Sequence, residues 1–177
     1  MQPLVPEVAR PGLKLATLWL GANDSAANAA QHVPLAEFER RLTAIAKALR
    51  ASCDAVVVIT PPPVVSSMWP DRSNPVAMVY GAAAARAAAA AGASLFDAYA
   101  HVMAASGDAW PAALSDGLHL SRSGGEVICA GLLAHIAEHH PSAHPDALPL
   151  DAPLWRDMNP ADPGSSLAAH VAAGGGE

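Results

Sequence analysis

The sequence predicts an α/β fold, a three-layer α/β/α sandwich with a parallel sheet. Three observations lead to this prediction: apolar, strand-like runs alternate with helical patterns from residue 13 onward, the joins between them are short, and an amphipathic helix separates the first two runs. A strand, a helix and a strand joined in this way form a parallel pair with a right-handed crossover. Repetition of that alternation along the chain indicates helices on both faces of the sheet.

Chain length and net charge limit the number of domains and the kinds of binding partner. The chain has 177 residues, enough for one domain with a real core, although much of its 52% hydrophobic content is alanine. The formal net charge is −6 and no Lys/Arg cluster is present, which argues against nucleic acid or an anionic membrane as a partner. No apolar run is long enough to span a bilayer, and no signal peptide is visible, so a cytoplasmic location is expected.

The first elements follow from apolar runs and prolines. Residues 1–12 contain three prolines and are expected to form an irregular lead-in. The segment from Leu13 to Leu20 is apolar except for Lys14 and Thr17, which is typical of a strand buried on both faces. A helix is predicted from a first-turn proline to the end of the next apolar face, over residues 34–51.

The middle of the chain continues the alternation. Residues 54–60 form a second buried strand, which the proline run beginning at Pro61 must end. Asn74 can cap a helix that includes the alanine-rich stretch 81–92, because alanine is the best helix former. Residues 94–96 are expected to form a short third strand.

The last helices complete a predicted domain over residues 13–140. Asp97 can cap a helix that runs to about Ala105, and a loop over 107–114 leads to a closing helix from Ser123. The sequence beyond this domain is rich in proline and then in glycine and alanine. We expect an extended strap over the body at 141–163 and a disordered tail at 164–177.

Neither cysteine nor histidine spacing suggests a metal site. Cys53 and Cys129 have no metal-binding spacing and are expected to be buried, reduced thiols. The eight histidines include no H-E-x-x-H arrangement. The sequence therefore predicts no metal.

A carboxylate three residues before an imidazole is the first candidate for chemistry. Gly117 lets the chain turn between Asp116 and His119, so that the two side chains can face one another. The carboxylate can then fix one imidazole nitrogen and leave the other to take a proton from a nucleophile. The spacing D-x-x-H alone is also typical of an exposed turn followed by a helix cap.

A second candidate follows the first predicted strand. Asn23, in the string Gly-Ala-Asn-Asp, can aim its side-chain amide into a site as an oxyanion donor, although such residues also favour a simple turn. The loop after the second strand leaves the same edge of a parallel sheet, where ligands of such sheets bind. Met68 and Trp69 could line an acyl or alcohol pocket there, or belong to a packed surface loop.

Taken in order, G-x-N-D after a strand and D-x-x-H near the far end resemble the SGNH or GDSL-type hydrolases. The strings GANDSA, QHVPL, ITPPPV and LSDGLHLS resemble the isoamyl-acetate-hydrolysing esterase subgroup, and the resemblance runs from about Leu13 to about Pro163. It implies a flavodoxin-like sheet with a central first strand. It also implies a small-molecule ester of a short acyl group as substrate, with no metal or organic cofactor.

The resemblance also assigns roles to residues. It makes His119 the general base and then the general acid, oriented by Asp116, and makes Asn23 and Gly21 part of the oxyanion hole. A possible substrate pocket would be lined by Pro62, Trp69 and Leu118.

The nucleophile motif of that family has no counterpart in this sequence. No serine follows a Gly-Asp pair, and the chain opens with a proline-rich stretch before its first convincing strand at Leu13. We therefore expect the family's first strand to be missing, identify no nucleophile, and expect the chain to be inactive as it stands. The alternatives are a truncated or dead paralogue with at most a binding role, and an unrelated α/β binding domain that carries these strings by coincidence. A G-D-S-encoding exon in frame upstream of Met1 would favour a truncated version of a real esterase.

Overall fold

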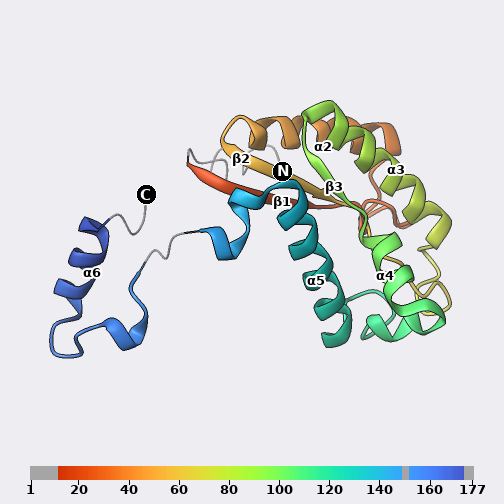
Figure 1. The fold of residues 1–177 in the computed structure, drawn as a ribbon. Coiled ribbons are helices and arrows are strands. Elements are labelled where there is room, and N and C mark those ends of the chain that lie inside the picture. The colour runs from red at the N-terminus through yellow and green to blue at the C-terminus, as the bar shows by residue number, and fades with distance from the viewer. Residues whose placement is uncertain (1–11, 149–151, 174–177) are drawn as a thin grey trace. The chain divides into compact units, whose positions relative to one another are not determined.

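The computed structural model describes residues 12–148 and 152–173, in two compact units that divide after Ala143. The first unit contains a parallel sheet of three strands in the order β1-β2-β3 (Figure 1). The strands are β1 (Leu13–Trp19), β2 (Cys53–Ile59) and β3 (Ser94–Phe96). The predicted parallel α/β architecture is confirmed.

The register brings the carboxyl ends of the three strands together. Trp19 pairs with Ile59, and Ile59 pairs with Phe96. All three strands therefore end at one edge of the sheet, and the loops that follow them leave from that edge. This is the edge at which ligands of open α/β sheets bind.

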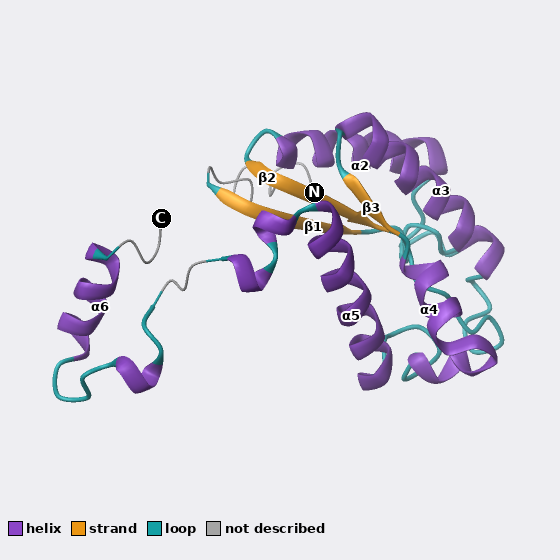
Figure 2. Ribbon diagram, viewed as in Figure 1, coloured by secondary structure: helices purple, strands orange, loops and turns teal. Residues whose placement is uncertain are grey.

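Helices cover both faces of the sheet (Figure 2). The first face carries α2 (Leu35–Arg50) and α3 (Asn74–Ala91), and the second carries α4 (Ala98–Ser106) and α5 (Arg122–His139). The 3₁₀ helix η2 (Gly107–Ala113) stands where a loop was expected.

The side chains of β2 show how the two faces are filled. Val58 packs with Phe38 and Tyr80 from α2 and α3, whereas its neighbours Val57 and Ile59 pack into the cluster on the opposite face. This is the period of two that a strand requires. Each of these valines is fully buried, and such burial stabilises the fold by roughly 1.5–3 kcal/mol per side chain.

The alanine run of α3 contributes packing. Ala83, Ala84 and Ala87 are completely buried against the same cluster. The run ends at Gly92, whose left-handed backbone (φ +65°) terminates the helix.

Two burial predictions are wrong. None of the β1 residues is buried, whereas all but one of the β2 residues are. The physical reason is position, because within the described residues β1 is an edge strand with a partner only in β2. Cys53 is buried and Cys129 is exposed on α5, so only one of the two thiols behaves as expected.

The second unit carries more regular structure than the strap and disordered tail expected at 141–163 and 164–177. Single turns of 3₁₀ helix occur at Pro145–Ala147 and Trp155–Asp157, and α6 (Pro163–Ala172) is a helix. Asp162 caps α6 by accepting from the Ser165 N–H at 3.2 Å, with a proline in the first turn and alanines after it. These helix-forming signals outweigh the Gly/Ala composition. The lead-in at 1–11 and residues 174–177 lie outside the described residues.

No helix among the described residues has the length and apolar character needed to cross a bilayer.

Candidate active site

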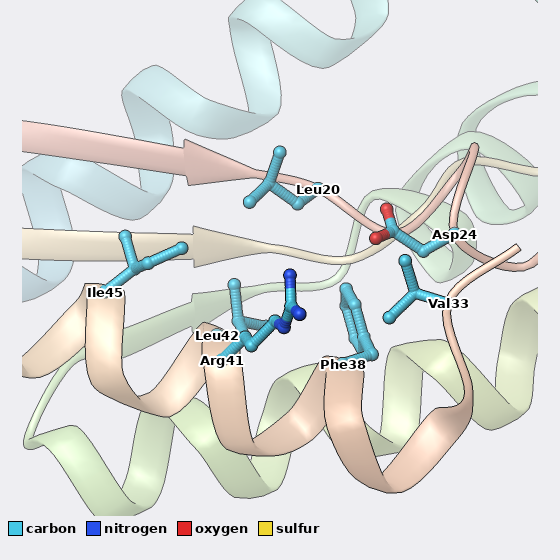
Figure 3. A pocket seen from close by; sticks show the side chains of 7 residues that line it. All are labelled: Leu20, Asp24, Val33, Phe38, Arg41, Leu42 and Ile45. Atoms are coloured by element: carbon cyan, nitrogen blue, oxygen red, sulfur yellow. The ribbon is translucent and has the colours of Figure 1, made fainter. Parts of the chain in front are cut away.

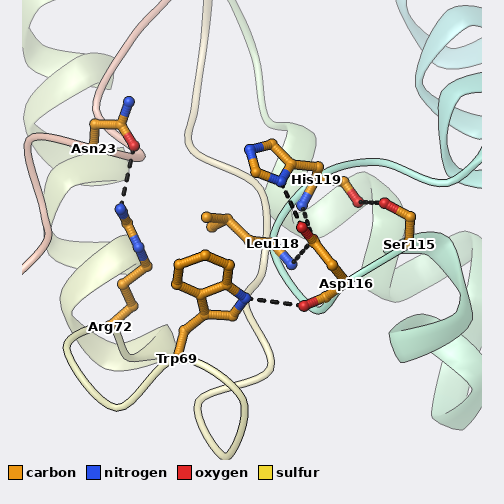
Figure 4. A network of polar contacts seen from close by, with 7 residues as sticks. All are labelled: Asn23, Trp69, Arg72, Ser115, Asp116, Leu118 and His119. Atoms are coloured by element: carbon orange, nitrogen blue, oxygen red, sulfur yellow. Dashed lines mark hydrogen bonds and ion pairs between the residues drawn. The ribbon is translucent and has the colours of Figure 1, made fainter.

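Three loops meet beyond the carboxyl ends of the strands. Two residues of the loop after β2 donate hydrogen bonds to the turn that precedes α5. Trp69 Nε1 donates to the Asp116 carbonyl at 2.9 Å, and the Val65 N–H donates to the Gly117 carbonyl at 2.8 Å. The same loop reaches the loop after β1 through Arg72 (Figure 4). The loop after β2 therefore joins the two segments that the sequence marked as candidates.

The predicted pair of Asp116 and His119 is formed. His119 Nδ1 lies 2.8 Å from Asp116 Oδ2, and Asp116 Oδ1 accepts from the backbone N–H groups of His119 (2.8 Å) and Leu118 (3.0 Å). The bond from the His119 side chain, followed by the two backbone bonds, lowers the pKa of Asp116 to about 2. The carboxyl group is therefore ionised across the neutral pH range and oriented by three donors.

The tight turn between these two residues depends on Gly117. Its φ is +81°, a left-handed conformation, and a Cβ at this position would lie 2.9 Å from the sulfur of Met68. The turn is closed by an antiparallel bridge between Leu114 and Leu120 and is followed directly by α5. The local sequence thus places the imidazole on a short, rigid hairpin at the mouth of a helix.

The other imidazole nitrogen faces outward. With Nδ1 bonded to Asp116, Nε2 makes no hydrogen bond to any described residue, and in Figure 4 it points to the side where Asn23 lies. Trp69 meets the imidazole edge-on, with ring centroids 6.5 Å apart and an angle of 85° between the rings. The side chain of His119 is 71% exposed, so a reacting group can reach Nε2.

Among the described residues, the side-chain amide of Asn23 has its oxygen bonded and its nitrogen unbonded. Arg72 Nη2 donates to Asn23 Oδ1 at 3.3 Å. A guanidinium group has no acceptor, so the atom it meets must be the amide oxygen. The nitrogen, Nδ2, has no hydrogen-bond partner within the described part of the chain and remains available as a donor.

Gly21 does not fit the oxyanion role that the resemblance assigns to it. Its N–H donates to Asp24 Oδ2 at 3.1 Å, so this donor is already used. Its φ is +110°, and a Cβ there would lie 2.9 Å from Pro61 and 3.0 Å from Phe38. Gly21 is needed for the turn and for close packing of the loop.

No serine among the described residues is bonded to the imidazole of His119. Ser25 Oγ donates to the Ala22 carbonyl at 3.1 Å, and Ser121 Oγ donates to the Ala112 carbonyl at 2.8 Å while capping α5. Ser115 Oγ donates to the backbone carbonyl of His119 at 3.1 Å. All thirteen serines of the chain lie within residues 12–148 and 152–173, so the masked residues contain no further serine.

The cavities near the site differ in size: one of about 300 Å³ is lined by residues that include Ser25, His32 and Arg72 from the loops after β1 and β2, and two others are much smaller. Pro62 and Leu118, two of the expected pocket residues, line a cavity of about 10 Å³ together with Ser25 and Arg72. A hollow of about 40 Å³ between the end of β1 and α2 is mostly apolar, as Figure 3 shows. Both are far below the roughly 300–1,000 Å³ of a typical ligand pocket. Trp69 lies beside the imidazole, as described above, and does not line either cavity.

Comparison with known proteins identifies the family. The model of the GDSL-like lipase/acylhydrolase family matches residues 2–127. The chain belongs to this family.

The curated relatives agree. The isoamyl acetate-hydrolyzing esterase 1 homolog of Bos taurus is 34% identical over 186 aligned residues, which cover 93% of this chain and 72% of the relative. The isoamyl acetate-hydrolyzing esterase of Saccharomyces cerevisiae is 27% identical, with 93% of this chain and 74% of the relative covered.

A solved lipase/acylhydrolase and a solved acetylxylan esterase share the fold. A lipase/acylhydrolase from Enterococcus faecalis superimposes with a TM-score of 0.60 at 25% identity, over 69% of this chain. An acetylxylan esterase from Geobacillus stearothermophilus gives 0.59 at 21% identity, which shows the fold alone. This chain covers 60% and 59% of the lengths of those two structures.

Arg72 is the site residue that sequence reasoning missed. It is a single basic residue three positions after Trp69, and nothing in its neighbourhood marks it as functional. Its partners lie 41 to 50 residues away along the chain, so no local pattern could have indicated them.

Within the described residues no group of three His, Cys, Asp or Glu side chains is arranged to hold a metal ion.

Proposed function

We propose that this chain supplies the general base, its orienting carboxylate and one oxyanion donor of a carboxylic ester hydrolase for short acyl esters such as isoamyl acetate. The observation that carries the proposal is the Asp116–His119 pair, bonded at 2.8 Å with Nε2 of the imidazole left unbonded. The family and the names of the relatives in cattle and yeast support the ester as the substrate class.

The geometry suits acyl transfer. A serine hydroxyl would pass its proton to His119 Nε2 as its oxygen attacks the ester carbonyl, and the ionised Asp116 would stabilise the imidazolium. Asn23 Nδ2 would donate to the oxygen that becomes negatively charged. The alcohol would leave with the proton from Nε2, and water would then release the acid by the same route.

The serine is the one component that this chain does not present to His119. We therefore propose that the chain by itself has no His119-dependent esterase activity, since groups that act as a unit lose most of their effect when one is removed. A dead paralogue that only binds is the alternative. Both proposals concern activity, and the same assay separates them.

The assay is hydrolysis of p-nitrophenyl acetate by the purified chain, and by a chimera that carries the G-D-S strand of a close relative before Leu13. We expect no His119-dependent turnover from the chain alone. The chimera should hydrolyse the acetate faster than the octanoate, and His119→Ala should abolish its activity.

The control is Ser25→Ala in both proteins, which should change neither result. A folded chimera without activity would favour the binding-only alternative. Turnover by the unmodified chain that disappears in Ser25→Ala would identify Ser25 as the nucleophile and overturn the proposal.

A further inference from the structure

Arg72 occupies an unusual electrostatic position. Arg72 is only 6% exposed, yet it takes part in none of the ion pairs within the described residues. Its Nε is buried without a hydrogen-bond partner. A buried cation without a counter-charge is costly, and an unsatisfied buried donor adds to the cost. An arginine kept in such a place calls for a compensating role.

The hydrogen-bond partners of the Arg72 guanidinium are all neutral, and all belong to the loop after β1. Nη1 donates to the Ala22 carbonyl at 2.5 Å, and Nη2 donates to Asn23 Oδ1 at 3.3 Å and to Gln31 Oε1 at 2.6 Å. The group therefore fixes both the backbone just before Asn23 and the side-chain amide of Asn23 itself.

The other side of Arg72 faces the Asp–His turn. Its Cζ lies 5.8 Å from the centroid of the Trp69 ring, in a cation–π arrangement. Trp69 in turn donates to the Asp116 carbonyl at 2.9 Å and meets His119 edge-on (Figure 4). One buried side chain thus connects the proposed oxyanion donor to the turn that carries the proposed base.

We propose that Arg72 is a positioning residue, whose guanidinium engages the Asn23 amide oxygen and so leaves the Nδ2–H free to donate to a developing oxyanion. Without Arg72, the two ends of the amide become nearly equivalent, and the amide can present its oxygen to a developing oxyanion. The positive charge beside Oδ1 also polarises the amide and strengthens Nδ2–H as a donor. This inference rests on the proposed function, but its first test does not require catalysis.

That test is NMR of the chain labelled with ¹⁵N-asparagine. The sequence contains four asparagines, so the spectrum should show four side-chain amide pairs, and Asn23→Asp identifies the pair of Asn23 by its loss. In Arg72→Met the Asn23 pair should move or broaden, because its orientation is no longer fixed. Arg72→Lys keeps the charge but not the fork of donors, and should give a smaller change.

Arg86→Met is the matched control, because Arg86 is an exposed arginine that pairs with Glu39 on the surface of the helices. It should leave the Asn23 pair in place. An Asn23 pair unchanged in folded Arg72→Met overturns the inference, whatever the activity of the protein. If Arg72→Met does not fold, an Asn23 pair unchanged in Arg72→Lys overturns it as well.

A second test uses the active chimera. Losing an oxyanion donor costs about 10²–10³-fold in kcat, so Arg72→Met should lower kcat by up to that factor with little change in KM. In an Asn23→Ala background the same change should have almost no further effect, because Arg72 acts through Asn23. Equal losses in both backgrounds would contradict the positioning role, whereas a chimera with no activity at all would count only against the proposed function.

Discussion

Adjacent glycines at the start of α5 should respond in opposite directions to the same added methyl group. Gly124 faces the backbone of Ala113, and a Cβ there would overlap the carbonyl oxygen and lie 2.8 Å from the carbonyl carbon. Gly125 has nothing within 4 Å of the same added atom. The Ala113 carbonyl also accepts from the Ser121 N–H at 2.8 Å, which closes the turn that carries Asp116.

The expected magnitudes follow from these contacts. In Gly124→Ala the helix start must move away from a backbone group that cannot rotate out of the way, which costs about 1–3 kcal/mol. Weakening the bond from Ser121 to Ala113 adds about 1 kcal/mol, and the better helix propensity of alanine returns about 1 kcal/mol. The net loss is about 2 kcal/mol. In Gly125→Ala only the propensity term applies, and the fold gains about 0.5–1 kcal/mol.

The assay is urea unfolding followed by circular dichroism, supported by thermal melts. The two variants should differ by about 3 kcal/mol in the free energy of unfolding, and by roughly 6–12 °C in Tm for a chain of this size. Equal stability of the two variants, or a Gly124→Ala protein as stable as the parent, would show that α5 does not approach the turn this closely.

Three further predictions concern the pH dependence of stability, the accessibility of the two thiols, and a glycine in the loop after β1. Burial, followed by the charges of neighbouring groups, lowers the pKa of His135 and His140 below the ordinary value of 6.5. The unfolded chain then takes up protons first as the pH falls below 6.5, so urea midpoints should decrease from pH 7.5 to 5.5, and less so in His135→Gln. Cys129 is exposed, whereas Cys53 is buried and its pKa is raised by that burial. A thiol reagent should therefore modify one thiol in the native chain and two thiols in urea. Modification of two thiols in the native chain would contradict the fold. Gly21→Ala should lower the free energy of unfolding by about 2–3 kcal/mol because of its left-handed backbone and close neighbours, and a neutral result would refute that packing.

The elements that could be predicted from the sequence are those specified by local patterns. The strand expected at 54–60 lies at 53–59, and the helix expected at 34–51 lies at 35–50. Apolar periodicity and a first-turn proline act within a few residues, so both can be recognised without knowledge of the tertiary structure. The burial of β1 could not be inferred in this way, because it depends on what lies beside the strand in the sheet.

The same distinction applies to the site. The Asp116–His119 bond depends on a three-residue spacing with Gly117 between, and this was apparent from the sequence. That the Gly21 N–H already donates to Asp24 was not apparent, because an aspartate at this position is equally consistent with a simple turn. Arg72 was missed altogether, since its significance comes from partners in another loop.

The loop after β2 makes the candidate site a single unit. The proposed oxyanion donor follows β1 and the proposed base precedes α5, and no hydrogen bond joins Asn23 directly to His119. Their relative position is instead held by Trp69 and Arg72, which lie three residues apart in that loop and bond to opposite sides of the site. A change in this loop should therefore disturb both halves together, whereas a change in either half should stay local. Sequence variation at Trp69 and Arg72 in an active relative would have to be compensated by a different bridge between the same two segments.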